Sequence, residues 1–157
     1  MLKRFFIFLE WVLVIFLGGQ ALLYILLSVS VLFSHSDEIR QAKKDGTYYS
    51  APAVTQSYFN RTLTVDGVAY DGKELRIYMT GRHFGSGSIL PSDFRVTTDT
   101  GEEFSIHGGH VSSSAYFAKG MYHMESVPAN LHSIRVHQEQ YGEAFSFTIP
   151  LGEGGKP

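Results

Sequence analysis

The sequence predicts an all-β domain, a two-sheet sandwich preceded by one N-terminal transmembrane helix. A long apolar stretch lies close to the N-terminus, and after Thr55 the chain consists of short segments in which apolar and polar residues alternate. The composition agrees with strands joined by tight turns, because the 157 residues include 12 Phe, 9 Tyr and 16 Gly. This length accommodates one ordinary domain and a terminal segment.

The N-terminal stretch has the length of a membrane span. From Phe5 to Phe33 its only polar side chains, apart from Tyr and Trp, are Glu10, Gln20 and two serines, and about 20 apolar residues suffice to cross the hydrocarbon layer as a helix. We expect a single-pass anchor over residues 1–34 in the lipid bilayer of the cell membrane. Glu10 and Gln20 are polar residues of this helix, and polar groups in a membrane often lie at helix contacts. Gln20 can pair with a neighbouring helix in self-association, whereas Glu10 is close enough to the inner end of the helix to reach the membrane interface.

A cleaved signal peptide is the alternative interpretation of this segment. Lys3 and Arg4 form a positively charged start, and Ser34 and Ser36 are small residues at a cleavage position. The apolar stretch, however, is about twice as long as a signal-peptide core of roughly 7 to 15 residues, and it contains the acidic Glu10. An uncleaved anchor therefore explains more of the pattern.

Positively charged residues flank the predicted span on both sides, Lys3 and Arg4 before it and others within 40–44 after it. The positive-inside count is therefore nearly balanced. We place the N-terminus in the cytoplasm, because so short a segment precedes the span and the following region has the pattern of an exported β module. The C-terminal domain is then extracytoplasmic.

After the span the chain divides into three parts. Residues 35–54 are polar, contain breakers at Asp45–Gly46 and Pro52, and are expected to form a stalk. Residues 55–151 carry the alternating pattern and form the sandwich, with a flexible loop at Gly85–Ser88. Residues 152–157 are expected to be a flexible tail.

The clearest strand is Glu74–Thr80, where alternation places Arg76 and Tyr78 on the exposed face. Asp66–Gly67 is expected to be a turn that ends a strand at Phe59–Val65. Further strands are expected at Val68–Tyr70, Phe94–Val96, Phe104–Ile106, Tyr116–Met124, Leu131–His137 and Phe145–Leu151. About seven or eight short strands favour two packed sheets, with a small barrel as the alternative.

Charge and cysteine content exclude several classes. A formal net charge of −2 argues against a nucleic-acid partner, which would require a clustered basic surface. The absence of cysteine excludes disulfides, thiolate metal sites and a cysteine nucleophile. An exported domain without disulfides fits a Gram-positive bacterial envelope better than a eukaryotic secreted module. We expect no cofactor.

Two segments resemble a known family. Thr62–Ile77 is similar to a recurring pattern in immunoglobulin-like extracytoplasmic domains of Gram-positive bacterial membrane proteins, among them anti-sigma-like proteins. Ser92–Phe94 followed by Thr100–Phe104 resembles the strand, turn, strand element of that group and of related lipoproteins. The likeness runs from about Thr55 to Leu151 and implies an immunoglobulin-like sandwich. It does not extend to sigma-factor binding, because only Met1–Arg4 precede the span.

A short histidine motif is the most site-like feature of the sequence. His107 and His110 flank a pair of glycines, and His123 is expected on a neighbouring strand. Three imidazoles from these positions would supply a metal site. The simpler interpretation is a glycine turn between strands with histidines on the surface.

The sequence predicts binding rather than catalysis. No serine lies in a Gly-x-Ser-x-Gly context, and the acidic pairs lie in turns or along strands. We expect a protein that is not an enzyme and whose sandwich binds another envelope component, either a protein or a wall polymer. The candidate contact residues are outward strand residues of types that interfaces use: Arg76, Tyr78, Arg135 and His137.

The alternative function is a pseudopilin-like structural subunit that polymerises through its N-terminal helix. Phe6–Glu10 is similar to the start of a mature type IV pilin, in which an acidic fifth residue follows a processed glycine. Phe5 stands where that glycine belongs, so the motif is incomplete.

Overall fold

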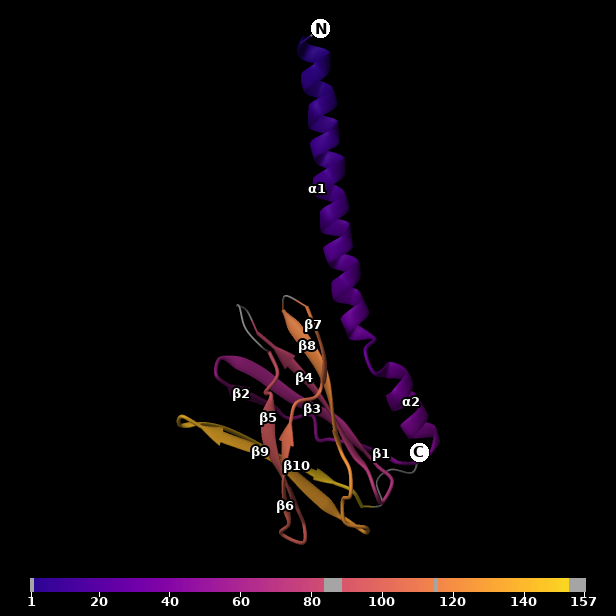
Figure 1. The fold of residues 1–157 in the computed structure, drawn as a ribbon, viewed down its shortest axis with the longest axis vertical. Helices are drawn as coiled ribbons and strands as arrows, with labels where there is room; N and C mark the ends of the chain where they lie inside the picture. The colour runs from indigo at the N-terminus through magenta and orange to yellow at the C-terminus, as the bar shows by residue number, and fades with distance from the viewer. Residues whose placement is uncertain (1, 84–88, 115, 153–157) are drawn as a thin grey trace.

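The computed structural model describes residues 2–83, 89–114 and 116–152, and consists of two helices followed by two antiparallel β-sheets (Figure 1). The long helix α1 (Leu2–Leu32) projects away from the sheets, and the short helix α2 (Ser36–Lys44) follows it. The loop expected at Gly85–Ser88, and the tail expected at 152–157 beyond Gly152, lie outside the described residues.

Helix α1 has the length and composition of a membrane span, and no other helix in the described part of the chain meets this test. Its apolar side chains from Phe5 to Leu26 are exposed instead of packing on the sheets, as expected for a helix surrounded by lipid. The predicted N-terminal helix is confirmed. After α1 the chain turns at His35, whose φ of 62° lies in the left-handed region.

The larger sheet, sheet A, has the strand order β1–β3–β4–β8–β7, with β2 also paired to β3. β1 and β2 share one edge of β3, because β1 pairs with residues 67–69 and β2 with residues 61–64. The strands are β1 (Tyr48–Ser50), β2 (Thr55–Tyr58), β3 (Arg61–Tyr70), β4 (Leu75–Arg82), β7 (His110–Ser113) and β8 (Phe117–Met124).

The turn expected at Asp66–Gly67 is instead an irregularity inside β3. The register between β3 and β4 shifts between Val65 and Gly67, so two predicted strands form one. A side chain at Gly67 would collide with the Tyr48 ring and approach the Tyr49 carbonyl oxygen to 2.8 Å. Glycine in a strand marks a bulge or a close backbone approach. Here the missing side chain at Gly67 allows β1 to approach β3 closely.

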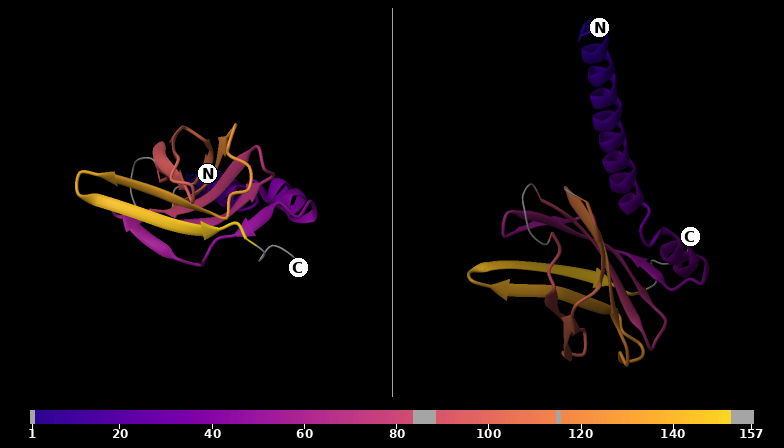
Figure 2. Two further views of the ribbon diagram at one scale, coloured as in Figure 1. Left: turned by 90° about the horizontal axis from the view of Figure 1, so that it is seen from below. Right: turned by 45° about the horizontal axis from the view of Figure 1, so that its top comes forward.

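The smaller sheet, sheet B, has the strand order β10–β9–β5–β6. Its strands are β5 (Asp93–Thr98), β6 (Glu103–His107), β9 (Ser133–Gln140) and β10 (Glu143–Pro150). The predicted hairpin between β5 and β6 is confirmed, with Gly101 at a φ of 87° in the turn. Figures 1 and 2 show the β9–β10 hairpin extending away from both helices.

The hydrophobic core lies between the two sheets and contains buried residues from both. Alternating residues expected to face inward on β4 and β10 are buried: Leu75, Ile77, Met79, Phe145, Phe147 and Ile149. The two-sheet, mainly β arrangement is therefore confirmed. The described residues form ten strands, more than expected, because the short strands β1, β2 and β7 carry no clear alternation.

Part of the segment expected to be a stalk packs on sheet A. Helix α2 buries Ala42 against Ala69 and Tyr78, and β1 joins the edge of the sheet. The exposure predicted for Tyr78 is wrong for this reason, since α2 covers β4 at this point and the side chain is only 2% exposed.

Candidate functional site

An open groove, the sheet B groove, lies where the β9–β10 hairpin separates from β5. Strand β9 pairs with β10 from Ser133 to Gln140, but with β5 only from Ile134 to His137. Beyond His137 the hairpin extends past the start of β5 at Asp93. A space of about 560 Å³ remains between the hairpin and the start of β5.

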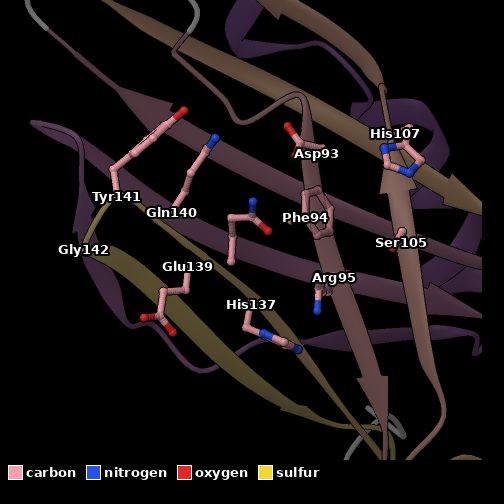
Figure 3. A pocket seen from close by; sticks show the side chains of 11 residues that line it. Asp93, Phe94, Arg95, Ser105, His107, His137, Glu139, Gln140, Tyr141 and Gly142 are labelled. Atoms are coloured by element: carbon pink, nitrogen blue, oxygen red, sulfur yellow. The ribbon is translucent and has the colours of Figure 1, made fainter.

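Polar side chains line most of the sheet B groove. Figure 3 shows Tyr141 and Gln140 on one side and Asp93 and His107 on the other. Phe94 belongs to the same wall but is buried toward the core. The groove therefore presents hydrogen-bonding groups from both of its sides to a molecule that enters it.

Charges of both signs are accessible in and beside the groove. Arg95 Nη1 donates a hydrogen bond to Glu103 Oε1 at 2.9 Å, and both side chains are exposed. His137 Nε2 lies 2.9 Å from Thr97 Oγ1, while Glu139 is an exposed acid on the hairpin side. Exposed ion pairs contribute little to stability, so these groups can exchange their partners for a ligand at low cost.

Tyr141 stands at the rim of the groove on a tight turn. Its φ is 50° and that of Gly142 is 80°, and its side chain is 89% exposed. Asn, Asp and Gly are favoured where a two-residue hairpin turn needs positive φ, so a bulky aromatic residue there is unfavourable for the backbone. Tyr141 buries almost nothing in this chain, so its ring is accessible from solvent.

The sequence pattern alone does not identify Tyr141 as a candidate site residue. The available signal was a large aromatic residue directly before Gly142, at a position that usually takes a small polar residue. Recognising the groove itself required the pairing of β9 with β5, which the alternation pattern does not specify.

The three histidines predicted as metal ligands are not brought together. His107 ends β6 in sheet B, whereas His110 and His123 lie on β7 and β8 of sheet A. Gly108–Gly109 carries the chain from one sheet to the other, and His123 lies 3.3 Å from Glu74. Within residues 2–83, 89–114 and 116–152 no three His, Cys, Asp or Glu side chains form a metal cluster. The metal-site prediction is wrong.

The four predicted contact residues are divided between the two layers. Arg135 and His137 lie on β9 in sheet B, where His137 lines the groove and Arg135 is exposed. Arg76 is exposed on sheet A and donates a hydrogen bond to Glu74 at 2.9 Å. Since Tyr78 is buried under α2, these four residues do not form one contact surface.

A second polar cluster lies where the helices meet sheet A. The buried His35 ring has Nδ1 3.3 Å from Glu38 Oε2 and packs near the rings of Tyr78 and His110, with both centroid distances 6.3 Å. Burial raises the pKa of Tyr78, and the Glu38 carboxylate raises it further. This partly exposed cluster joins the helices to the sandwich.

The polar residues of the predicted span, Glu10 and Gln20, both lie on the exposed surface of α1. This position leaves them open to lipid or to a second helix. Self-association through α1 therefore remains a prediction.

Comparisons with protein-family models, with curated proteins and with solved structures find no match to this chain. The resemblance of residues 55–151 to immunoglobulin-like extracytoplasmic domains stays a prediction. What the structure shows is a sandwich of two antiparallel sheets, and the function has to be inferred from the geometry of the chain.

Proposed function

We propose that this chain is a single-pass membrane protein whose extracytoplasmic sandwich binds another component of a bacterial envelope and does not catalyse a reaction. Helix α1 is the anchor, with the N-terminus in the cytoplasm. The observation that carries the proposal is the sheet B groove, an open polar surface with the exposed Tyr141 at its rim.

The groove lies on the layer that the helices leave uncovered. Helix α1 contacts β7 and β8, and α2 contacts β1 and packs on Ala69 and Tyr78, all of which belong to sheet A. The β9–β10 hairpin extends away from both helices (Figure 1). A large partner can therefore reach the groove without displacing the anchor.

The lining favours a wall polymer over a protein as the partner. Aspartate and glutamate are depleted at protein interfaces, whereas this groove has Asp93 and Glu139 within it. A sugar ring carries hydroxyl groups at its edge and C–H groups on its faces. Carboxylates can accept hydrogen bonds from the hydroxyls and a guanidinium group can donate hydrogen bonds to them. The exposed ring of Tyr141 can stack on a sugar face.

Co-sedimentation of the full-length protein in detergent with purified, insoluble Gram-positive peptidoglycan tests the proposal. Tyr141→Asn removes the ring but keeps a residue that tolerates the turn, and we expect binding about tenfold weaker, as for a residue that dominates a contact. Arg95→Ala and Arg76→Ala form a matched pair, because each arginine is exposed and donates a 2.9 Å hydrogen bond to a glutamate.

Weaker binding for Arg95→Ala with unchanged binding for Arg76→Ala supports a contact at the groove. The reverse result would place the contact on sheet A and contradict the proposal. If the parent protein does not sediment with the polymer but captures an envelope protein in a Tyr141-dependent manner, the partner is a protein and the polymer assignment is wrong.

Polymerisation through α1, as in a pseudopilin, is the second candidate. It rests on the exposed apolar surface of α1, which fits neighbouring helices as well as lipid. Mass spectrometry of the mature N-terminus separates the two. Processing near Phe5 supports the polymerising subunit, and an intact N-terminus supports the anchor.

A further inference from the structure

The apolar surface of α1 continues to the sandwich. Leu32, the last residue of α1, is exposed, and Phe33, in the turn that follows it, is 68% exposed. Large apolar side chains avoid water, and the apolar stretch is longer than the hydrocarbon layer requires. If α1 spans a membrane, as proposed above, the membrane surface reaches the turn between α1 and α2.

Strand β8 is joined to α1 at this same level. The Lys119 ammonium group donates a hydrogen bond of 2.8 Å to the carbonyl oxygen of Leu32, and α1 also contacts β7. Figures 1 and 2 show the adjacent ends of β7 and β8 reaching up beside the last turns of α1. The residues that precede Lys119 on β8 therefore lie on the membrane side of this hydrogen bond.

We propose that the membrane edge of sheet A, formed by Arg82, Tyr116, Phe117 and Lys119, rests on the lipid headgroups and holds the sandwich in a fixed orientation. Tyr116 is 60% exposed, and Phe117 is half-buried. Phe117 is the register partner of the exposed Arg82 across β4 and β8.

The chemistry of this edge matches the interfacial region of a bilayer. Tyrosine is enriched there because its ring is apolar and its hydroxyl group is polar. Arginine and lysine are attracted to anionic lipid headgroups. The edge combines the two kinds of side chain on the same side of the molecule as the exposed Phe33.

This orientation has a consequence for the sheet B groove. The membrane edge and both helix contacts belong to sheet A, while the groove belongs to sheet B and its rim residue Tyr141 lies on the hairpin that extends away from α1. A sandwich fixed in this way keeps the groove open toward the envelope. Binding to a wall polymer would then not compete with contact to the membrane.

Tryptophan fluorescence in brominated vesicles tests the membrane edge, because the chain has a single tryptophan, Trp11, inside α1. The full chain is reconstituted into vesicles of phosphatidylcholine and anionic phosphatidylglycerol whose acyl chains carry bromine near the carbonyl end. Trp11→Phe combined with Tyr116→Trp places the only tryptophan at the membrane edge. Trp11→Phe combined with Tyr141→Trp is the matched control at another exposed tyrosine.

We expect the tryptophan at position 116 to be quenched about threefold more strongly than the one at position 141, since an interfacial residue lies near the bromine atoms. Lys119→Gln should reduce the quenching at position 116, because it weakens the hydrogen bond to Leu32. Near-ultraviolet circular dichroism shows whether each variant keeps its fold.

Equal quenching at both positions, or none at position 116 in a folded variant, would overturn the membrane edge. A measurement on the unsubstituted protein distinguishes a wrong membrane edge from a wrong membrane anchor. Vesicles brominated along the acyl chains should quench Trp11 if α1 spans the membrane, and the absence of that quenching would contradict the proposed function itself.

Discussion

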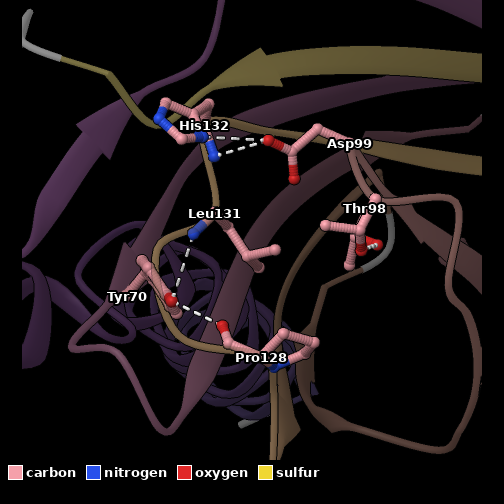
Figure 4. Close-up of polar contacts among 7 residues, drawn as sticks. Tyr70, Thr98, Asp99, Pro128, Leu131 and His132 are labelled. Carbon is pink, nitrogen blue, oxygen red and sulfur yellow. Dashed lines mark hydrogen bonds and ion pairs between the residues drawn. The ribbon is translucent and has the colours of Figure 1, made fainter.

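The hydroxyl group of Tyr70 donates a hydrogen bond of 2.6 Å to the carbonyl oxygen of Pro128 (Figure 4). Tyr70 ends β3 in sheet A, while Pro128 lies in the connection from β8 to β9, where the chain passes from sheet A to sheet B. The Leu131 amide donates a longer bond of 3.5 Å to the same hydroxyl. One phenol group thus holds the crossover between the two layers.

Tyr70→Phe is expected to lower the free energy of unfolding by about 1–2 kcal/mol, because it leaves a part-buried carbonyl and a buried amide without their partner. Denaturant unfolding of the full chain in detergent, followed by near-ultraviolet circular dichroism, measures the change. Tyr141→Phe is the control, since that side chain is exposed and should tolerate the loss of its hydroxyl group. Equal losses in the two variants would contradict a specific role for Tyr70.

Gly67→Ala is expected to destabilise the sandwich by about 1–3 kcal/mol through overpacking, because the new methyl group would collide with the Tyr48 ring. The loss should be smaller when Tyr48→Ala is already present, since contacting sites are not additive. Gly152→Ala is the control, with open space around the added carbon. Thermal unfolding of the variants in detergent checks this, and additive losses would show that the Tyr48 ring is not the obstacle.

Period-two alternation predicted the core-facing residues of the regular strands. It places Leu75 and Ile77 of β4, and Phe145 and Phe147 of β10, on the buried face, and all four are buried. Alternation succeeds here because one face of each strand packs against the opposite sheet.

Alternation does not predict what covers the other face. Tyr78 follows the outward pattern and is nevertheless buried, because α2 folds back onto sheet A. The apolar face of α2 is short and lies within a charged segment, so its composition resembles that of a stalk.

The candidate sites depended on pairing between distant strands, which local sequence does not encode. His107 and His110 are close in sequence but belong to different sheets. His107 and Tyr141 are far apart in sequence and line one groove. The metal motif therefore failed, and the sheet B groove was visible only in the structure.

Asp99 is predicted to stabilise the fold above acidic pH. The backbone amide of His132 donates a hydrogen bond of 3.0 Å to its carboxylate, and this bond, together with the His132 ring, lowers the pKa of Asp99 from its ordinary value of 3.8. The native state then binds fewer protons than the unfolded state. The contribution of Asp99 to stability is therefore present above pH 3.8 and is lost as the pH falls through its native pKa.

Asp99→Asn should therefore melt at a lower temperature than the parent protein at neutral pH, and the difference should shrink as the pH falls below 3.8 and through the native pKa of Asp99. Melting temperatures of the two proteins in detergent, measured from pH 2 to 7, check this. A difference that is independent of pH would mean that the substitution acts through the shape of the side chain and not through its charge.

Asp66 is predicted to have the opposite pH dependence. Partial burial raises the pKa of this carboxyl group from its ordinary value of 3.8, although part of the residue stays exposed, the Thr80 hydroxyl donates to it at 2.7 Å and Lys119 lies near enough to lower the pKa. The native state therefore binds more protons than the unfolded state just above pH 3.8. This contribution to stability is present below pH 3.8 and is lost as the pH rises through the native pKa of Asp66.

Asp66→Asn keeps an acceptor for the Thr80 hydroxyl and removes the charge that burial disfavours. We expect this variant to be more stable than the parent protein at neutral pH, with the advantage shrinking as the pH falls toward 3.8. Melting temperatures over the same pH series, with Asp99→Asn beside it, test the opposite signs of the two carboxylates. A lower melting temperature of Asp66→Asn at neutral pH would show that attraction to Lys119 outweighs the cost of burying the charge.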